Sequence, residues 1–346
     1  MLKAMRFGVV GAVGAMLVGA AVSCRPALAQ RAETIKVDGS STVFPITEAV
    51  AEEFQAANKG MKVTVGLSGT GGGFKKFTRG EIDISAASRP IQAKEMEEAK
   101  KNGIEYIELP IAFDALTVTV NPKNTWVTEF TIEDLRKAWE PGAQGAITKW
   151  SQIRPDWPER DLTLYGAGSD SGTFDYFTEA VNGKPKASRG DYTASEDDNV
   201  LVQGIARDGN AMGYFGYAYY ATNKDKLKAV PVVNPKTGKA VAPSEQTVMD
   251  GSYAPLSRPI FIYVSKKSLD ARPEVRKFVE FYLENAPALV KEVNYIPLPA
   301  EAYQKCLSRV RDGGTGTAFG GHSQTGTHVN ELFSRPLTTE IPGEKK

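Results

Sequence analysis

Cysteine and histidine are the scarcest reactive side chains of this 346-residue chain, which has two of each. The two cysteines have no metal-ligand spacing, and Cys24 lies in the N-terminal apolar stretch, so we expect no disulfide. Both histidines, His322 and His328, lie in a Gly/Thr-rich C-terminal tail. This scarcity disfavours a histidine-dependent hydrolase or a metal-dependent phosphatase, and we expect no cofactor.

An excess of charge of either sign is also missing. The 42 basic and 41 acidic side chains leave a net charge of +1, which gives no indication of a nucleic-acid surface. After the first thirty residues, no run is apolar enough to cross a bilayer, which takes roughly 20 residues. Any anion must therefore be bound by local geometry. The length and the 41% hydrophobic content suit two lobes with separate cores.

The N-terminus has the three parts of a secretory signal. Two basic residues precede the apolar run Phe7–Val22, and a small-x-small cleavage site ends at Ala29. We therefore predict a signal peptide over residues 1–29 and export to the periplasm. The stretch "AVSC" also resembles a lipoprotein signal, so a lipid anchor on Cys24 is the alternative to simple cleavage.

The mature chain alternates strands and helices. Short strand patterns near residues 34–39, 61–67 and 81–88 are each followed by a helical pattern, which is typical of a parallel α/β sheet. Two long β-rich runs, Ile111–Val120 and Arg258–Lys267, bracket a second strand–helix set. The sequence thus predicts two α/β lobes joined by two crossover strands, as in a hinged binding protein.

Three segments repeat one pattern, in which a strand ends in Ser, Thr and Gly and a helix then opens with an aromatic residue. They are "GSSTVFP", "SGTGGGF" and "GSDSGTF". Each is compatible with an ordinary helix N-cap, and the glycines with a tight turn or a flexible loop. Three together, divided between the lobes, favour a small oxyanion held at helix N-termini and strand carboxyl ends. The spacings do not match a nucleotide P-loop, a nucleophile elbow or a dinucleotide fingerprint.

Four motifs carry a family resemblance. In order, "DGSSTVFPI", "SGTGGGFKKF", "DISAASRPI" and "GSDSGTFDYF" resemble the phosphate-binding proteins of the phosphate ABC transporter (the PstS family), most closely its SphX-like cyanobacterial branch. With further matches the resemblance runs from about Val37 to about Val264. It implies a type II periplasmic-binding-protein fold with phosphate in the interlobe cleft. The expected division is lobe I at 33–115 and 260–310, lobe II at 116–259, and a tail at 311–346.

The resemblance also implies which residues bind phosphate. The matching positions of the three contact motifs are Ser41, Thr42, Val43 and Phe44, then Thr70 with Ser68 as an alternate, then Ser171, Gly172 and Thr173.

Two positions depart from the family pattern. Ser88 stands where many members have an aspartate that accepts the proton of hydrogen phosphate, and Ala167 stands where many have an arginine. We expect Arg89 to supply the cation, because its planar fork suits an oxyanion. The alternative is that Arg89 forms a salt bridge across the cleft.

The lost aspartate raises a question of selectivity. Hydrogen phosphate carries a proton that sulfate lacks, so an ionised carboxylate in the site accepts from phosphate and repels sulfate. Asp170 is the first candidate for this acceptor, and Asp83 is the second, although its place inside a strand favours a structural role.

The leading hypothesis is a monomeric periplasmic receptor without catalysis, which delivers phosphate to the membrane permease subunits of an ABC transporter and binds no nucleic acid. One alternative is a receptor for sulfate or molybdate. Others are an exported phosphatase, and an adhesive or signalling role of the closed form.

Overall fold

The computed structural model describes residues 34–169, 171–195, 197–322 and 329–342. The predicted signal peptide, Cys24 and Asp170 lie outside these ranges. In the described part of the chain, no helix is both long enough and apolar enough to span a membrane.

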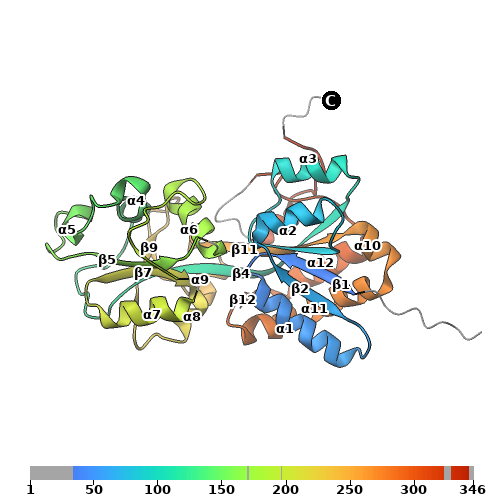
Figure 1. Ribbon diagram of the computed structural model, residues 1–346, viewed down its shortest axis with the longest axis horizontal. Coiled ribbons are helices and arrows are strands. Elements are labelled where there is room, and N and C mark those ends of the chain that lie inside the picture. Colours follow the sequence, from blue (N-terminus) through green and yellow to red (C-terminus); the bar gives the residue numbers. More distant parts are fainter. Residues whose placement is uncertain (1–33, 170, 196, 323–328, 343–346) are drawn as a thin grey trace, which may run out of the picture. The chain divides into compact units, whose positions relative to one another are not determined.

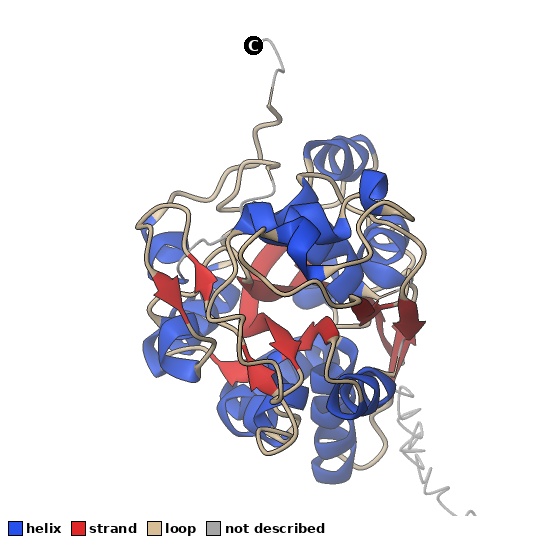
Figure 2. Cartoon of the chain, turned by 90° about the vertical axis from the view of Figure 1, so that its left-hand side faces the viewer, coloured by secondary structure: helices blue, strands red, loops and turns tan. Residues whose placement is uncertain are grey.

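A mixed sheet of ten strands runs through the described chain in the order β2-β1-β3-β11-β4-β7-β5-β6, with β8 and β12 also paired to β4 (Figure 1). Figure 2 shows helices on both sides of the strands, as in other α/β folds. The strands of this sheet are β1 (Ile35–Gly39), β2 (Val63–Leu67), β3 (Ile84–Ala87), β4 (Tyr106–Val120), β5 (Thr163–Ala167), β6 (Thr193–Ser195), β7 (Ala211–Gly216), β8 (Lys228–Ala229), β11 (Ser257–Ser265) and β12 (Ile296–Pro297). A small separate sheet joins β9 (Val232–Val233) to β10 (Ala240–Val241).

The first lobe contains the parallel strands that the sequence predicts. Strand β1 pairs in parallel with β2 on one side and with β3 on the other, so all three end at the same edge. The later strand β11 adds antiparallel to β3, which makes the sheet mixed. The helices of this lobe are α1 (Phe44–Ala57), α2 (Gly69–Phe77), α3 (Ala93–Lys101), α10 (Lys266–Ala271), α11 (Pro273–Glu292) and α12 (Ala300–Asp312).

The second lobe continues the sheet from the far half of β4. Strand β7 pairs antiparallel with β4, and β5 lies parallel to both β7 and β6. The helices of this part are α4 (Ile132–Trp139), η1 (Pro141–Ala143), α5 (Trp150–Ile153), α6 (Gly172–Asn182), α7 (Asp198–Arg207), α8 (Tyr217–Ala221) and α9 (Glu245–Met249). The short helix α13 (Val329–Ser334) lies near the C-terminus.

Strands β4 and β11 form the connection between the lobes. They pair antiparallel from Tyr106 with Ser265 to Ala115 with Ser257, and β4 continues as the partner of β7. Every residue of both strands is buried. The sequence predicts a strand from Ile111, but β4 begins five residues earlier, at Tyr106, and includes Glu108, which is buried and hydrogen-bonded.

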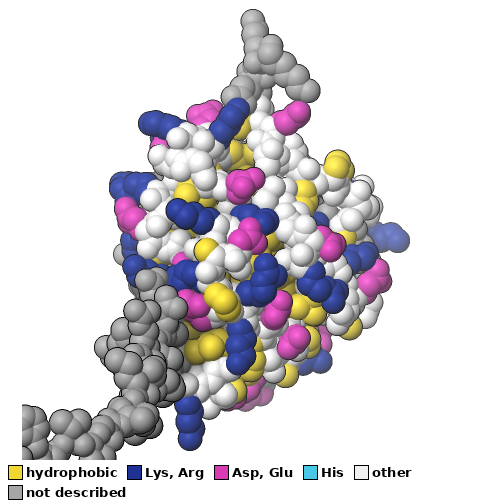
Figure 3. Space-filling model, turned by 90° about the vertical axis from the view of Figure 1, so that its right-hand side faces the viewer, with side chains coloured by type: hydrophobic (Ala, Val, Ile, Leu, Met, Phe, Trp, Pro, Cys, Tyr) yellow, Lys and Arg dark blue, Asp and Glu magenta, His cyan; other side chains and the backbone are white. Residues whose placement is uncertain are grey.

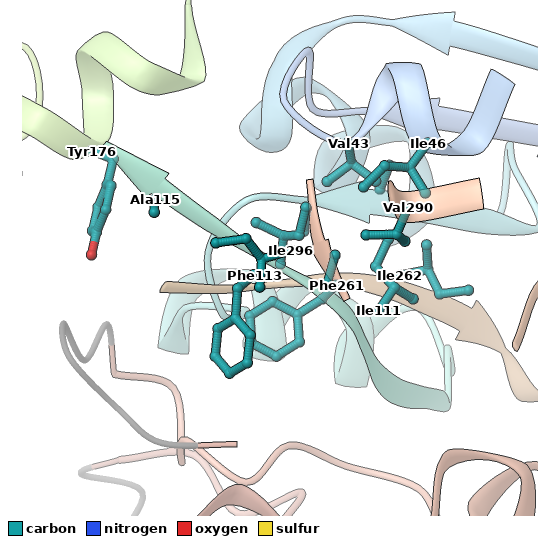
Figure 4. Close-up of a cluster of buried hydrophobic side chains, with 14 of the residues drawn as sticks. Val43, Ile46, Ile111, Phe113, Ala115, Tyr176, Phe261, Ile262, Val290 and Ile296 are labelled. Atoms are coloured by element: carbon teal, nitrogen blue, oxygen red, sulfur yellow. The ribbon is translucent and has the colours of Figure 1, made fainter. Parts of the chain in front are cut away.

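The core of the first lobe lies between the sheet and its helices. Figure 4 shows Val43 and Ile46 near the apolar side chains of β4, β11 and α11. Phe54 of α1 is fully buried and meets the ring of Phe278 edge-on at 5.1 Å. A fully buried side chain of this kind contributes about 1.5–3 kcal/mol. On the face shown in Figure 3, basic and acidic side chains are interspersed, as the near-zero net charge suggests.

Candidate oxyanion site

A cavity of about 670 Å³ is lined by the turns that follow β1, β2 and β3 and by the start of α6. Strand β11 adds one residue to its wall. The lining residues are Ser40, Ser41, Leu67, Ser68, Gly69, Thr70, Gly71, Gly72, Ser88, Arg89, Gln92, Gly172, Asp175, Tyr176, Glu179, Pro185, Lys186 and Arg258. The cavity therefore lies at strand carboxyl ends and helix N-termini, where α/β folds hold anions.

The glycine cluster forms the first turns of α2, with Ser68 at the N-cap. A side chain at Gly73 would reach within 2.7 Å of the Gly39 backbone and 2.9 Å of the Ser85 hydroxyl, so this glycine lets α2 pack directly onto the sheet. Around Gly71, by contrast, no atom lies within 4 Å of an added Cβ. Close packing thus explains Gly73, whereas Gly71 leaves the wall of the cavity open.

The hydroxyl groups of the first lobe are linked to one another. Thr70 and Ser88 share a hydrogen bond of 3.0 Å, and the Ser88 amide donates to Thr70 Oγ1 at 3.1 Å. Ser68 donates its proton to Asp38 at 2.6 Å, and Lys76 donates to the other oxygen of that carboxylate. Burial opposes ionisation, but these hydrogen bonds lower the pKa of Asp38. Ser68 thus anchors the turn to an ionised aspartate.

Helix α6 brings the second lobe into contact with the first. Ser171 caps it by accepting from the Thr173 amide at 3.1 Å. The Gly172 amide donates to Ser41 Oγ at 3.3 Å, and an added Cβ at Gly172 would lie 2.5 Å from Thr42 Oγ1. Gly172 therefore packs closely against the β1–α1 turn.

The predicted residues divide into two groups. The cavity wall includes Ser41, Ser68, Thr70, Ser88, Arg89 and Gly172. It does not include Thr42, Val43, Phe44, Ser171 or Thr173. Val43 belongs to the core, and Thr173 lines a separate small cavity beside Asp114 and Tyr295.

Arg89 lies in the wall of the cavity, but its guanidinium is also held within its own lobe. Two parallel hydrogen bonds of 2.8 and 2.9 Å join it to the Glu95 carboxylate of α3, and a third of 3.0 Å reaches Pro90 O. The charge lies 5.5 Å from the centre of the Phe74 ring. Burial opposes the charged form, but the hydrogen bonds to Glu95 raise the pKa of Arg89. This salt bridge lies within the lobe of Arg89, whereas the alternative expectation was a salt bridge across the cleft.

Arg258 is a second arginine in the wall, and the sequence analysis missed it. It is 6% exposed on β11, and its Nη2 donates to Asp114 Oδ2 at 3.0 Å and to Gly172 O at 3.1 Å. Its guanidinium lies 4.0 Å above the Tyr176 ring, which favours a cation. An arginine inside the apolar run "RPIFIYV" was the signal that could have revealed it.

Two carboxylates, Asp175 and Glu179, also line the cavity. Asp175 Oδ1 is buried and accepts no hydrogen bond from the described residues, and Lys186 Nζ lies 3.9 Å from it. Burial raises the pKa of Asp175, although the charges of Lys186, Arg258 and Arg89 oppose this shift.

The second candidate acceptor, Asp83, does not line the cavity. It accepts from Arg272 at 2.7 and 2.8 Å, from Ser268 Oγ at 2.8 Å and from the Lys36 amide at 2.9 Å. These bonds give Asp83 the structural role that its place in the sequence favours. Among the described residues, no cluster of three or more His, Cys, Asp or Glu could hold a metal ion.

Two α/β lobes joined by paired strands, with a polar cavity at strand carboxyl ends, define a solute-binding protein. The chain belongs to the PBP superfamily, because residues 26–286 match the model described as "PBP superfamily domain".

Similar proteins include "Protein SphX" of Synechococcus elongatus, which is 54% identical over 307 residues, or 89% of this chain and 90% of that protein. "Phosphate-binding protein PstS" of Staphylococcus saprophyticus is 39% identical over 315 residues, which cover 90% and 95% of the two chains. The crystal structure of "a possible phosphate binding protein" from Planctomyces limnophilus is 50% identical, covers 81% of this chain and 98% of that one, and superposes with a TM-score of 0.72.

Proposed function

We propose that this protein is an exported receptor that binds inorganic phosphate in the cavity and delivers it to the permease subunits of an ABC transporter. The observation that carries the proposal is the convergence of three Ser/Thr/Gly turns and two arginines on one cavity at helix N-termini. The phosphate-binding relatives support the choice of ligand. The cavity offers donors and charge for binding, and we assign it no catalytic step.

In this proposal, hydrogen bonds to the phosphate ion replace hydrogen bonds that the protein groups now make with each other. The Thr70 and Ser88 hydroxyls, now joined to each other, and the Gly172 amide, now joined to Ser41, become its neutral donors. Arg258 and Arg89 supply positive charge from the cavity wall. The contacts of Thr42, Val43, Phe44, Ser68, Ser171 and Thr173 with the ion remain predictions from the family pattern.

We further propose Asp175 as the acceptor for the proton of hydrogen phosphate. Its buried Oδ1 has no donor among the described residues, and it belongs to the cavity wall. Sulfate has no proton to donate, so it would leave this buried oxygen atom unpaired beside a like charge, which costs free energy. Asp170, which lies outside the described residues, remains a prediction for the same role.

A receptor for sulfate or molybdate is the second candidate, because Ser88 replaces the usual aspartate. Export to the periplasm, a monomeric state and lobe boundaries near residues 115/116 and 259/260 belong to the same proposal, with a lipid on Cys24 as the alternative to simple cleavage of the signal peptide.

Calorimetric titration of the mature, phosphate-stripped protein tests both candidates. We expect saturable 1:1 binding of phosphate, and weak or undetectable binding of sulfate and molybdate at the same concentrations. Tight binding of sulfate or molybdate with weak phosphate binding would favour the second candidate. Failure to bind any of the three ions would overturn the receptor proposal altogether.

A further inference from the structure

The C-terminal strap, defined here as residues 313–322, follows α12 and lies against the first lobe. The Gly316 amide donates to Tyr106 O at 2.9 Å beside the start of β4. Thr317 and Thr338 exchange two backbone hydrogen bonds of 2.9 and 3.0 Å, so a second piece of the C-terminus pairs with the strap. The Phe319 ring meets Phe261 of β11 edge-on at 5.6 Å. The predicted tail is thus partly built into the lobe.

The strap supplies hydrogen bonds to a buried carboxyl group. Glu108 of β4 is 1% exposed, and its Oε2 accepts from Thr317 Oγ1 at 2.5 Å and from the Tyr263 hydroxyl at 2.7 Å. Its Oε1 accepts from the Ala318 amide at 3.0 Å. Burial raises the pKa of Glu108, although these three hydrogen bonds oppose the shift. Two of the three donors belong to the strap, so the acid depends on it for hydrogen bonding.

The same network reaches the wall of the oxyanion cavity. The Tyr263 hydroxyl, while donating to Glu108, accepts from the Ile91 amide at 2.9 Å. Further along the strap, Gly321 O accepts from the Ala93 amide at 3.0 Å. These two amides flank Gln92, a lining residue, and Ile91 lies two residues after Arg89. The strap therefore fixes both sides of the β3–α3 connection.

The guanidinium of Arg89 is held by a residue that closely follows the β3–α3 connection. Its partner Glu95 lies in the first turn of α3 and also accepts from the Gln92 amide at 2.9 Å. A shift of the α3 N-terminus would move Glu95, and with it the arginine.

We infer that the C-terminal strap positions the Arg89 side of the cavity for oxyanion binding, with Thr317 and Glu108 as positioning residues that act through Tyr263 and Ile91. This inference rests on the proposed function for its ligand. It assigns to the C-terminus an effect on affinity as well as on stability.

The test compares two buried threonines of the first lobe. Thr317→Val removes the hydroxyl that donates to Glu108 and accepts from the Phe319 amide at 3.1 Å, and Thr47→Val, the control, removes a hydroxyl bound to Tyr282 at 3.1 Å. Both side chains are fully buried. One lost hydrogen bond corresponds to roughly two- to tenfold in an equilibrium constant. We expect Thr317→Val to weaken phosphate binding by such a factor, Thr317→Ser to restore it, and Thr47→Val to leave it unchanged.

A double-mutant cycle tests whether Thr317 affects phosphate binding through Arg89. In the Arg89→Lys background, Thr317→Val should lose most of its effect on affinity, because the group that it positions has been altered. Full additivity of the two substitutions would overturn the inference, as would equal phosphate affinities of Thr317→Val and Thr47→Val. If Thr317→Val does not fold, Glu108→Gln takes its place in the cycle.

Amide hydrogen exchange without phosphate gives an independent readout. We expect faster exchange at Ile91 and Ala93 in Thr317→Val than in Thr47→Val, since the strap holds both amides. Unchanged exchange at these two amides would contradict the inference even if the affinity fell. Failure of the wild-type protein to bind phosphate would instead defeat the proposed function, and the exchange experiment would still test the strap.

Discussion

We expect Gly172→Ala to hinder the close approach of the two lobes without lowering the stability of either lobe. The added Cβ would lie 2.5 Å from Thr42 Oγ1 and 3.3 Å from Ser88 Oγ, whereas ordinary contacts begin near 3.4 Å. The α6 backbone or the Thr42 side chain must therefore move before the two lobes can approach this closely. Within its own lobe, the residue is the first of helix α6, a position that alanine adopts without strain.

The cost of the clash sets the size of the effect. Inserting a methyl group into a well-packed contact costs about 1–3 kcal/mol, and here that cost applies only to the arrangement in which α6 touches the β1–α1 turn. We expect phosphate affinity to fall by roughly five- to 150-fold. The melting temperature of the phosphate-free protein should stay the same or rise slightly, because alanine is a better helix former than glycine.

Calorimetric titration with phosphate, beside a melting curve in its absence, measures both quantities. Gly209→Ala is the control, since it also adds a methyl group in the second lobe but meets nothing within 4 Å and lies outside the cavity wall. Gly172→Ala combined with Thr42→Ala should recover part of the affinity by removing the hydroxyl that clashes. Wild-type affinity in Gly172→Ala would refute the reasoning that binding requires this close approach.

Further predictions concern charge and core. Arg258→Lys keeps a cation beside Asp114 but loses the planar fork, so titration should show phosphate affinity lowered by about tenfold or more; an unchanged affinity would remove Arg258 from the site. Arg89→Ala should lower affinity by about tenfold to over a hundredfold by titration, and a smaller loss would mean that the guanidinium serves mainly its own lobe. Because the folded-state pKa of Asp175 is raised, the phosphate-free protein should lose stability as the pH rises above the ordinary carboxyl pKa. Asp175→Asn should make the melting temperature depend less on pH over this range, and it should also reduce discrimination against sulfate. The same pH dependence of the melting temperature in wild type and Asp175→Asn would contradict this assignment of Asp175. Phe54→Ala should lower the free energy of unfolding by about 3–5 kcal/mol in denaturant titrations without changing affinity, since the ring is buried and does not belong to the cavity wall.

The sequence predicted the strand–helix alternation because it depends on local patterns, and the same patterns place the proposed site at the ends of strands. Apolar periodicity and turn residues lie close together in the chain, and parallel strands necessarily end at one edge. The glycine cluster shows the limit of this reasoning. Its composition indicated an anion-binding turn, but only the packing of Gly73 against Gly39 shows that one of these glycines serves the contact between α2 and the sheet.

Side-chain partners distant in sequence could not be predicted. Arg258 joins the site through Asp114, 144 residues earlier, and Glu95 holds Arg89 through a helix that reads as a plain charged surface. Thr173 follows the family motif but lines the neighbouring small cavity. In each case the determining factor is the direction of a side chain in the assembled fold, on which sequence spacing alone says little.

The position of β11 has a consequence for the order of folding. This strand lies between β3 and β4, although it follows both by more than 130 residues, so the first lobe's sheet remains interrupted until the chain has passed residue 265. The second lobe needs only the far half of β4 and strands β5 to β7, which lie within about 100 residues of one another. Contacts that are nearer in sequence close smaller loops and form sooner. The second lobe, in the middle of the chain, should therefore fold first. The sheet of the first lobe, whose strands β1 to β3 are synthesised earliest, should be completed last.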